Sequence, residues 1–241
     1  MNKVILITGA AKRIGREMAW TFFNADWNVI IHFNSSNSDA EKLSEEMNAI
    51  RENSASTIQA NLDNLEDVTF LAKNALLAFN RVDALINNAS TFYSTPMEDF
   101  SNSDWDALMG SNLKAPLFLI QALQKELKKN EGFVLNITDI NIERPIANHA
   151  IYLAAKAGLS TITEALAKDL APQIRVNAIA PGAILEPPHK EWSAIQKEAI
   201  IGTIPLGRLG TEHDIAQAAL FLSEATYVTG QTINIDGGKS L

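Results

Sequence analysis

Tyr152 and Lys156 are the residues of this sequence best suited to acid–base chemistry. They stand four positions apart in a stretch of helical period, so their side chains share one face of a helix. A tyrosine has an ordinary pKa of about 10, and the lysine cation should lower the pKa of Tyr152 by favouring the tyrosinate. Asp139 precedes the tyrosine and adds a carboxylate. The three groups suit a reduction that adds a hydride to one atom and a proton to its neighbour.

A second candidate site lies at the start of the chain, in "VILITGAAKRIGREMA". This stretch predicts a strand, a turn and the first turn of a helix. Gly9 and Gly15 are placed so that the backbone can approach a pyrophosphate at the helix N-terminus. Arg13 stands between them and can reach an adenosine 2′-phosphate with its planar fork of donors.

The second expected strand ends "IIHFNSS" and carries no acid. Sheets that bind NAD usually place an Asp or Glu there for the ribose hydroxyls, and an acid would repel the extra phosphate of NADP. His32, Asn34, Ser35 and Ser36 are donors instead. We therefore expect NADPH/NADP rather than NAD.

The elements that must position these residues alternate along the chain. Short apolar runs rich in β-branched residues predict buried strands at 4–8, 28–33, 56–60, 84–87, 133–138, 174–180 and 232–235. Stretches of helical period predict helices at 14–24, 39–51, 65–79, 105–129, 151–170 and 212–222. This alternation predicts an α/β fold: a Rossmann-type doubly wound parallel sheet of about seven strands, with helices on both faces in three αβα layers.

Two irregular segments, 90–104 and 181–204, are long enough to be functional loops, and we expect the substrate there. The stretch 186–192 contains two prolines and is expected to cover the substrate. No linker or repeat interrupts the pattern, so we expect residues 1–241 to form a single domain.

Composition excludes several classes of protein. Apolar residues make up 46% of the chain and charged residues 20%, which is typical of a soluble globular protein. The absence of cysteine excludes disulfides and thiol nucleophiles. A net charge of −8 disfavours nucleic acid as a partner. No apolar run approaches the length of a membrane helix, and no histidine spacing indicates a metal site. We expect a soluble, cytoplasmic protein without a metal.

Several motifs, in order, resemble those of the short-chain dehydrogenase/reductase family. They are "TGAAKRIG" at 8–15, "NNAS" at 87–90, Asn112 in a long helix, Tyr152 with Lys156, "PG" at 181–182 and "TGQTINIDGG" at 229–238. The resemblance covers nearly the whole chain, although Arg13 replaces the middle glycine of the family's dinucleotide turn. It implies nucleotide contacts from the following further residues: Ile14, Asn61, Leu62, Asn88, Ala89, Ser90, Tyr152, Lys156, Pro181 and Gly182. It also implies that Asn112 kinks its helix and orders a proton-relaying water. The protein is further implied to be a homotetramer that assembles through the helices at 105–129 and 151–170.

Within that family the sequence most resembles pteridine reductases. Most family members have a serine where this chain has Asp139, and these reductases share the exchange at Asp139 and that at Arg13. The stretches "NNASTFYSTP" at 87–96 and "GSNLKAPLFLI" at 110–120 are also similar to theirs. The resemblance implies that Phe92 stacks a pterin against the nicotinamide and that Ser90 lines the same loop. The implied substrate is a dihydropterin, with dihydrofolate or an oxidised pterin as further possibilities in folate metabolism.

Other interpretations remain open. A carbonyl reductase such as a 3-oxoacyl reductase would keep the fold and the cofactor, but a carboxylate at position 139 would repel a carbonyl oxygen. A nucleotide-binding scaffold without turnover would not need the Tyr152–Lys156 pair. Taken singly, Tyr152 is compatible with a core aromatic, Asp139 with a helix cap and Phe92 with a packed loop anchor.

Overall fold

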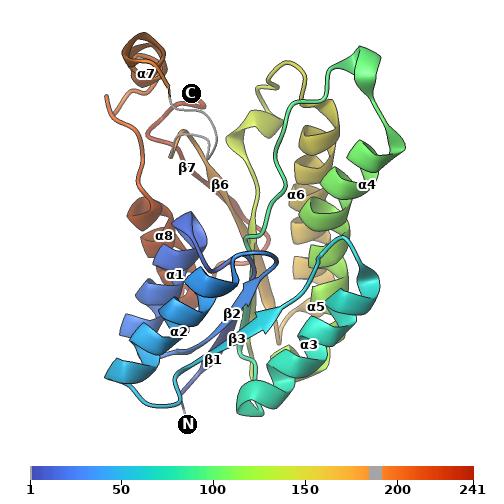
Figure 1. Cartoon of the computed structure of the whole chain (residues 1–241), viewed down its shortest axis with the longest axis vertical. Coiled ribbons are helices and arrows are strands. Elements are labelled where there is room, and N and C mark those ends of the chain that lie inside the picture. The colour runs from blue at the N-terminus through green and yellow to red at the C-terminus, as the bar shows by residue number, and fades with distance from the viewer. Residues whose placement is uncertain (1, 185–191) are drawn as a thin grey trace.

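The described residues of the computed structural model, 2–184 and 192–241, contain a parallel sheet of seven strands (Figure 1). The strands are β1 (Val4–Ile7), β2 (Asn28–Phe33), β3 (Ala55–Gln59), β4 (Ala84–Asn87), β5 (Phe133–Ile137), β6 (Arg175–Pro181) and β7 (Thr232–Ile235). Their order is β3-β2-β1-β4-β5-β6-β7. The chain therefore runs from β1 to one edge and crosses back to β4. This reversal creates a switch point between β1 and β4, where open parallel sheets bind ligands.

Helices cover both faces of the sheet, which confirms the predicted three-layer, doubly wound fold (Figure 1). One face is covered by α1 (Arg13–Asn24), α2 (Asn37–Ile50) and α8 (Glu212–Glu224). The other is covered by α3 (Leu65–Phe79), α5 (Ala115–Lys129) and α6 (Ala150–Leu170). No helix among the described residues is long and apolar enough to cross a membrane.

Alternation along β1 explains how the sheet holds both layers. Ile5 and Ile7 belong to the cluster on the α1 face, whereas Val4 and Leu6 belong to the cluster on the α3 face. Successive side chains of a strand point to opposite faces, so a strand buried on both sides must be apolar throughout. Phe22 of α1 is fully buried, and burial of such a side chain contributes about 1.5–3 kcal/mol.

The helix expected at 105–129 is divided. Helix α4 (Asn102–Met109) leads into a π-helical turn, η2 (Gly110–Lys114), and then into α5. Pro116, in the first turn of α5, has no backbone N–H to continue a regular ladder. The π-turn is the kink that the resemblance implies at Asn112.

The segment 181–204 is less irregular than expected, because α7 (Ala194–Ile201) lies within it. Its start has a capping box, in which Ser193 and Gln196 each bond to the other's backbone. The sequence S-x-x-Q is a signal for a helix start, and it could have located α7. The expectation that 186–192 covers the substrate falls almost entirely outside the described residues.

The structure also contains two short 3₁₀ turns: η1 (Met97–Asp99) in the first long loop and η3 (Ile140–Ile142) directly after Asp139.

Candidate active site

The glycines of the first turn have the geometry that a nucleotide requires. Gly9 has a left-handed φ of 63°, and a Cβ there would stand 3.0 Å from Cα of Ala89. Gly15 is packed against the turn more tightly still, since its Cβ would lie 2.2 Å from the Gly9 carbonyl oxygen. A larger side chain at either position would collide with the neighbouring backbone and distort the turn. The turn is therefore a cradle in which backbone can approach a phosphate.

Arg13 occupies this turn in a left-handed conformation, with a φ of 52°. Such a φ favours glycine, which explains why the family motif has glycine at this position. The side chain of Arg13 is exposed at the first residue of α1. Its neighbours Lys12 and Arg16 are paired with Asp39 and Glu46 of α2.

His32 plays a different part from the one expected. Its Nδ1 accepts the Gly9 N–H at 3.1 Å, so its Nε2 carries the proton and donates to the Ala60 carbonyl at 3.1 Å. Burial lowers the pKa of His32 to about 4, with the bond to Ala60 opposing that shift, and the ring is neutral near pH 7. Both ring nitrogens are committed to the backbone. The expectation that His32 donates to a phosphate is therefore replaced by a role in holding the turn.

Several of the other residues that were expected to contact the nucleotide line a single pocket. This pocket, of about 150 Å³, is lined by ten residues from the carboxyl ends of β1 to β4 and the π-turn: Gly9, His32, Asn34, Asn61, Leu62, Asp63, Ala89, Ser90, Thr91 and Ser111. Ser35 and Ser36 lie at the exposed start of α2 beside it, and Ile14 packs on the core. Pro181 and Gly182 lie at the end of β6, where the Gly182 N–H donates to Ile235.

Thr8 joins the two strands at the switch point, and the sequence analysis did not single it out. Its Oγ1 accepts hydrogen bonds from the backbone N–H groups of Asn88 and Ala89, at 2.9 and 3.0 Å. The side-chain amide of Asn88 in turn donates to the carbonyl of Thr8, at 2.8 Å. In the sequence, the position of Thr8 directly before Gly9 could have identified it.

Asp139, Tyr152 and Lys156 come together as expected. The Tyr152 hydroxyl donates to Oδ2 of Asp139 at 2.8 Å. Lys156 lies one turn further along α6, 5.8 Å from the Tyr152 ring centroid, and donates to the Ile137 carbonyl at 2.8 Å. Tyr152 and Lys156 are 5% and 2% exposed. Lys156 is therefore not an ordinary surface lysine whose ammonium group reaches the solvent.

The pKa of Tyr152 departs from the expectation. Burial, followed by the charge of Asp139 and the hydrogen bond to it, raises the pKa of Tyr152 well above its ordinary value, and Ser90 opposes the shift. The prediction that the pKa of Tyr152 is lowered is wrong, because burial, the largest cause, and the negative charge of Asp139 both raise it. Burial also lowers the pKa of Lys156 to about 8, an effect that Asp139 opposes. Tyr152 thus holds its proton firmly at neutral pH.

Asn112 fixes the loop above the site. From the π-turn its side-chain amide donates to the carbonyls of Thr91 and Leu108, at 2.8 and 2.9 Å. Its Oδ1 accepts from the Ser90 hydroxyl at 2.7 Å. The bonds to Ser90 and Thr91 orient the segment after β4, and the bond to Leu108 lies within the helix.

Phe92 stands at the mouth of the site. Its ring meets Tyr152 edge-on with centroids 4.8 Å apart, and it stacks on His149 at the same distance with 19° between the planes. The side chain of Phe92 is 49% exposed. A loop anchor would be buried in the core, whereas this ring is available to a planar ligand.

The fold and the site together define a class. A nucleotide cradle at the switch point and a buried Tyr–Lys pair beside it belong to oxidoreductases that move a hydride and a proton. The model of the family described as enoyl-(acyl carrier protein) reductase matches residues 9–240. The chain belongs to the short-chain dehydrogenase/reductase family and is an oxidoreductase of that family.

Curated relatives carry the name 3-oxoacyl-[acyl-carrier-protein] reductase. The chain is 35% identical to the one from Staphylococcus epidermidis over 242 aligned positions, covering 99% of both chains. It is 34% identical to those from Staphylococcus aureus (99% of this chain, 98% of the relative) and Synechocystis sp. (98% and 96%). These comparisons confirm the family. They do not confirm the narrower resemblance to pteridine reductases.

The pKa of Lys156 leads to a testable pH dependence. The lysine loses its cation as the pH rises through about 8. We expect kcat/KM for the nucleotide, which reports the free enzyme, to decline above that pH. Initial rates at pH 6–10 measure the decline. Lys156→Arg keeps its charge over this range, so any residual activity of that variant should show no such decline. A flat wild-type profile between pH 7 and pH 9.5 would contradict the assignment.

Proposed function

We propose that this chain is an NADPH-dependent reductase of pteridines, acting on a dihydropterin. The observation that carries the proposal is the contact between Oδ2 of Asp139 and the Tyr152 hydroxyl, at 2.8 Å. In most of the family a neutral serine occupies this position. A carboxylate accepts hydrogen bonds only, so it is suited to a substrate that presents N–H groups.

The number of free acceptor positions on Asp139 also supports a substrate with N–H groups. Its Oδ1 accepts from the backbone N–H and the side-chain amide of Asn141, both at 2.7 Å. Its Oδ2 accepts from Tyr152. An ionised carboxylate has about four acceptor positions, so one remains for a substrate. An amino group or ring N–H of a pterin can fill it, whereas a carbonyl oxygen would meet like partial charge.

The residues present fit NADPH. The glycine cradle accommodates a pyrophosphate, and the end of β2 carries no acid that would repel a 2′-phosphate. Arg13, Asn34, Ser35 and Ser36 would hold that phosphate, and Lys156 would hold the nicotinamide ribose. When bound, the nucleotide supplies the hydride.

The protein's own residues supply the proton. Tyr152 gives its hydroxyl proton to the ring nitrogen of the reduced C=N bond, breaking its O–H bond as the new N–H bond forms. The hydroxyl must first turn from Asp139 toward the substrate. A substrate N–H at the remaining acceptor position of Oδ2 weakens the hydrogen bond from Tyr152 and favours that turn. Phe92 stacks on the planar ring and excludes water from one side.

Reduction of a 3-oxoacyl group is the second candidate, and a specific finding favours it. Relatives of that name align with this chain over nearly the full length at 34–35% identity. Their names support this candidate better than they support pteridine reduction. The case for a pteridine comes from the chemistry of Asp139 and Phe92, and a fold alone does not fix a substrate.

The substrate prediction is tested by NADPH oxidation with a dihydropterin and a 3-oxoacyl thioester in parallel. Wild-type protein should turn over the dihydropterin faster. Asp139→Ser, which introduces the family's common residue, should lower dihydropterin turnover by about 10²-fold, as expected for loss of an acid–base group, while thioester turnover is kept or rises. Asp169→Ser, an exposed acid at the end of α6, is the matched control.

Faster thioester turnover by the wild type would establish the second candidate. Folded protein that binds NADPH but turns over neither substrate would indicate a nucleotide-binding scaffold.

Nucleotide preference should depend on Arg13. Arg13→Gly removes the guanidinium and suits the left-handed backbone. Because a hydrogen bond to a charged group contributes about 1.5–3 kcal/mol, we expect the preference for NADPH over NADH to fall by about 10-fold to 100-fold. Titration of both nucleotides measures it. Arg16→Ala, three positions on, is the control; an unchanged preference in Arg13→Gly would contradict the assignment.

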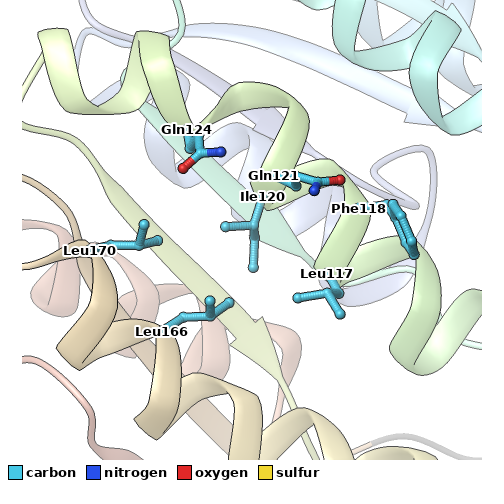
Figure 2. A pocket seen from close by; sticks show the side chains of 7 residues that line it. All are labelled: Leu117, Phe118, Ile120, Gln121, Gln124, Leu166 and Leu170. Carbon is cyan, nitrogen blue, oxygen red and sulfur yellow. The ribbon is translucent and has the colours of Figure 1, made fainter.

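We also propose, on the family resemblance, that the protein is a homotetramer. An apolar pocket of about 250 Å³ lies between α5 and α6, on the helices implied to form the interface (Figure 2). Its lining includes Leu117 and Phe118, each 37% exposed.

Light scattering should therefore give a tetramer for the wild type. Phe118→Asp should dissociate it by placing a charge in a desolvated contact. Ile50→Asp, at the exposed end of α2, should not. A monomeric wild type would contradict the proposal.

A further inference from the structure

Asn141 binds the oxygen of the Asp139 carboxylate that Tyr152 does not contact. Its backbone N–H and its side-chain Nδ2 both donate to Oδ1, each at 2.7 Å. The Tyr152 hydroxyl donates to the other oxygen, Oδ2. The two oxygens of one carboxylate are therefore assigned to different partners.

The backbone bond alone has an ordinary explanation. Asp139 is the N-cap of the 3₁₀ turn η3, and a capping side chain accepts from the N–H two residues ahead. The second bond, from the amide of Asn141, is not needed for capping. It fills the remaining acceptor position of Oδ1 and fixes the rotation of the carboxylate about its terminal bond, which is otherwise broad and roughly two-fold.

We propose that Asn141 is a positioning residue, which holds the Asp139 carboxylate with Oδ2 turned to Tyr152 and the substrate. The inference rests on the catalytic role proposed for Asp139, but the contact between Asp139 and Tyr152 that Asn141 maintains is present whichever substrate the protein reduces. Without the amide, only the backbone N–H of Asn141 holds Oδ1, so the plane of the carboxylate can tilt and the hydroxyl of Tyr152 loses its fixed acceptor. Misplacement of a catalytic group on this scale lowers turnover without affecting distant binding contacts.

Two variants separate a donor role from a role in packing. Asn141→Ala removes the donor and most of the side chain. Asn141→Asp keeps the size and shape but replaces the donor with a charged acceptor that faces Asp139. If the amide is required as a donor, the aspartate variant is at least as impaired as the alanine variant. If Asn141 only fills space, the aspartate variant resembles the wild type.

The first readout is turnover of whichever substrate the wild type reduces. A hydrogen bond to a charged group corresponds to a factor of roughly ten or more, so kcat should fall about ten-fold in Asn141→Ala and at least as far in Asn141→Asp. KM for NADPH should change less than about two-fold. In an Asp139→Asn background neither change should lower kcat further. Asn74→Asp, at a partly exposed asparagine of α3 whose amide donates to the Phe70 carbonyl of the same helix, is the control.

The second readout requires no substrate, so it remains valid if the proposed function fails. Like-charge repulsion should lower the melting temperature of Asn141→Asp by about 2–4 °C. In the Asp139→Asn background the shift should vanish. An equal shift in both backgrounds, or wild-type kcat in Asn141→Asp, would overturn the proposal.

Discussion

The hydrogen bond between Tyr152 and Asp139 is the interaction on which the chemistry of this site depends. The phenol is almost fully buried, and its hydroxyl meets a carboxylate and not a neutral side chain. Burial and that negative charge together keep the proton on Tyr152. The buried Lys156 ammonium stands beside the pair and balances part of its charge. Tyr152 therefore keeps its proton in this arrangement. A substrate must compete with the Tyr152 hydroxyl for Asp139 before the proton can be transferred.

The parallel sheet supplies the positions of these groups. Asp139 follows β5, and the cofactor turn follows β1, so both lie beyond carboxyl ends of the same sheet. Thr8 ties the ends of β1 and β4 together through two backbone N–H groups, and His32 holds Gly9 from β2. These partly buried bonds hold the cradle through the protein's own backbone. Preorganisation of this kind lowers the cost of ordering on binding.

Much of this arrangement follows from local patterns in the sequence. Apolar runs located all seven strands, and the period of four joined Tyr152 to Lys156 on one helical face. The remaining features depend on contacts between distant segments. In the π-turn, Asn112 bonds to Thr91 and Ser90 in the segment after β4, and no local pattern shows these bonds. The direction of the Tyr152 pKa shift depended on burial and on a charge brought from thirteen residues away. From its position in the sequence, His32 was expected to donate a hydrogen bond to a phosphate. In the folded protein both of its ring nitrogens form hydrogen bonds with backbone groups.

The central claim is that an acid and a phenol converge to protonate a planar nitrogen heterocycle. It is tested most directly by a crystal structure with NADP and a bound pterin. The account predicts that one oxygen of Asp139 lies within about 3.2 Å of both the Tyr152 hydroxyl and a substrate nitrogen, the normal hydrogen-bond range, with the pterin ring stacked on Phe92. A carboxyl group of Asp139 turned into bulk solvent, away from Tyr152, would contradict it.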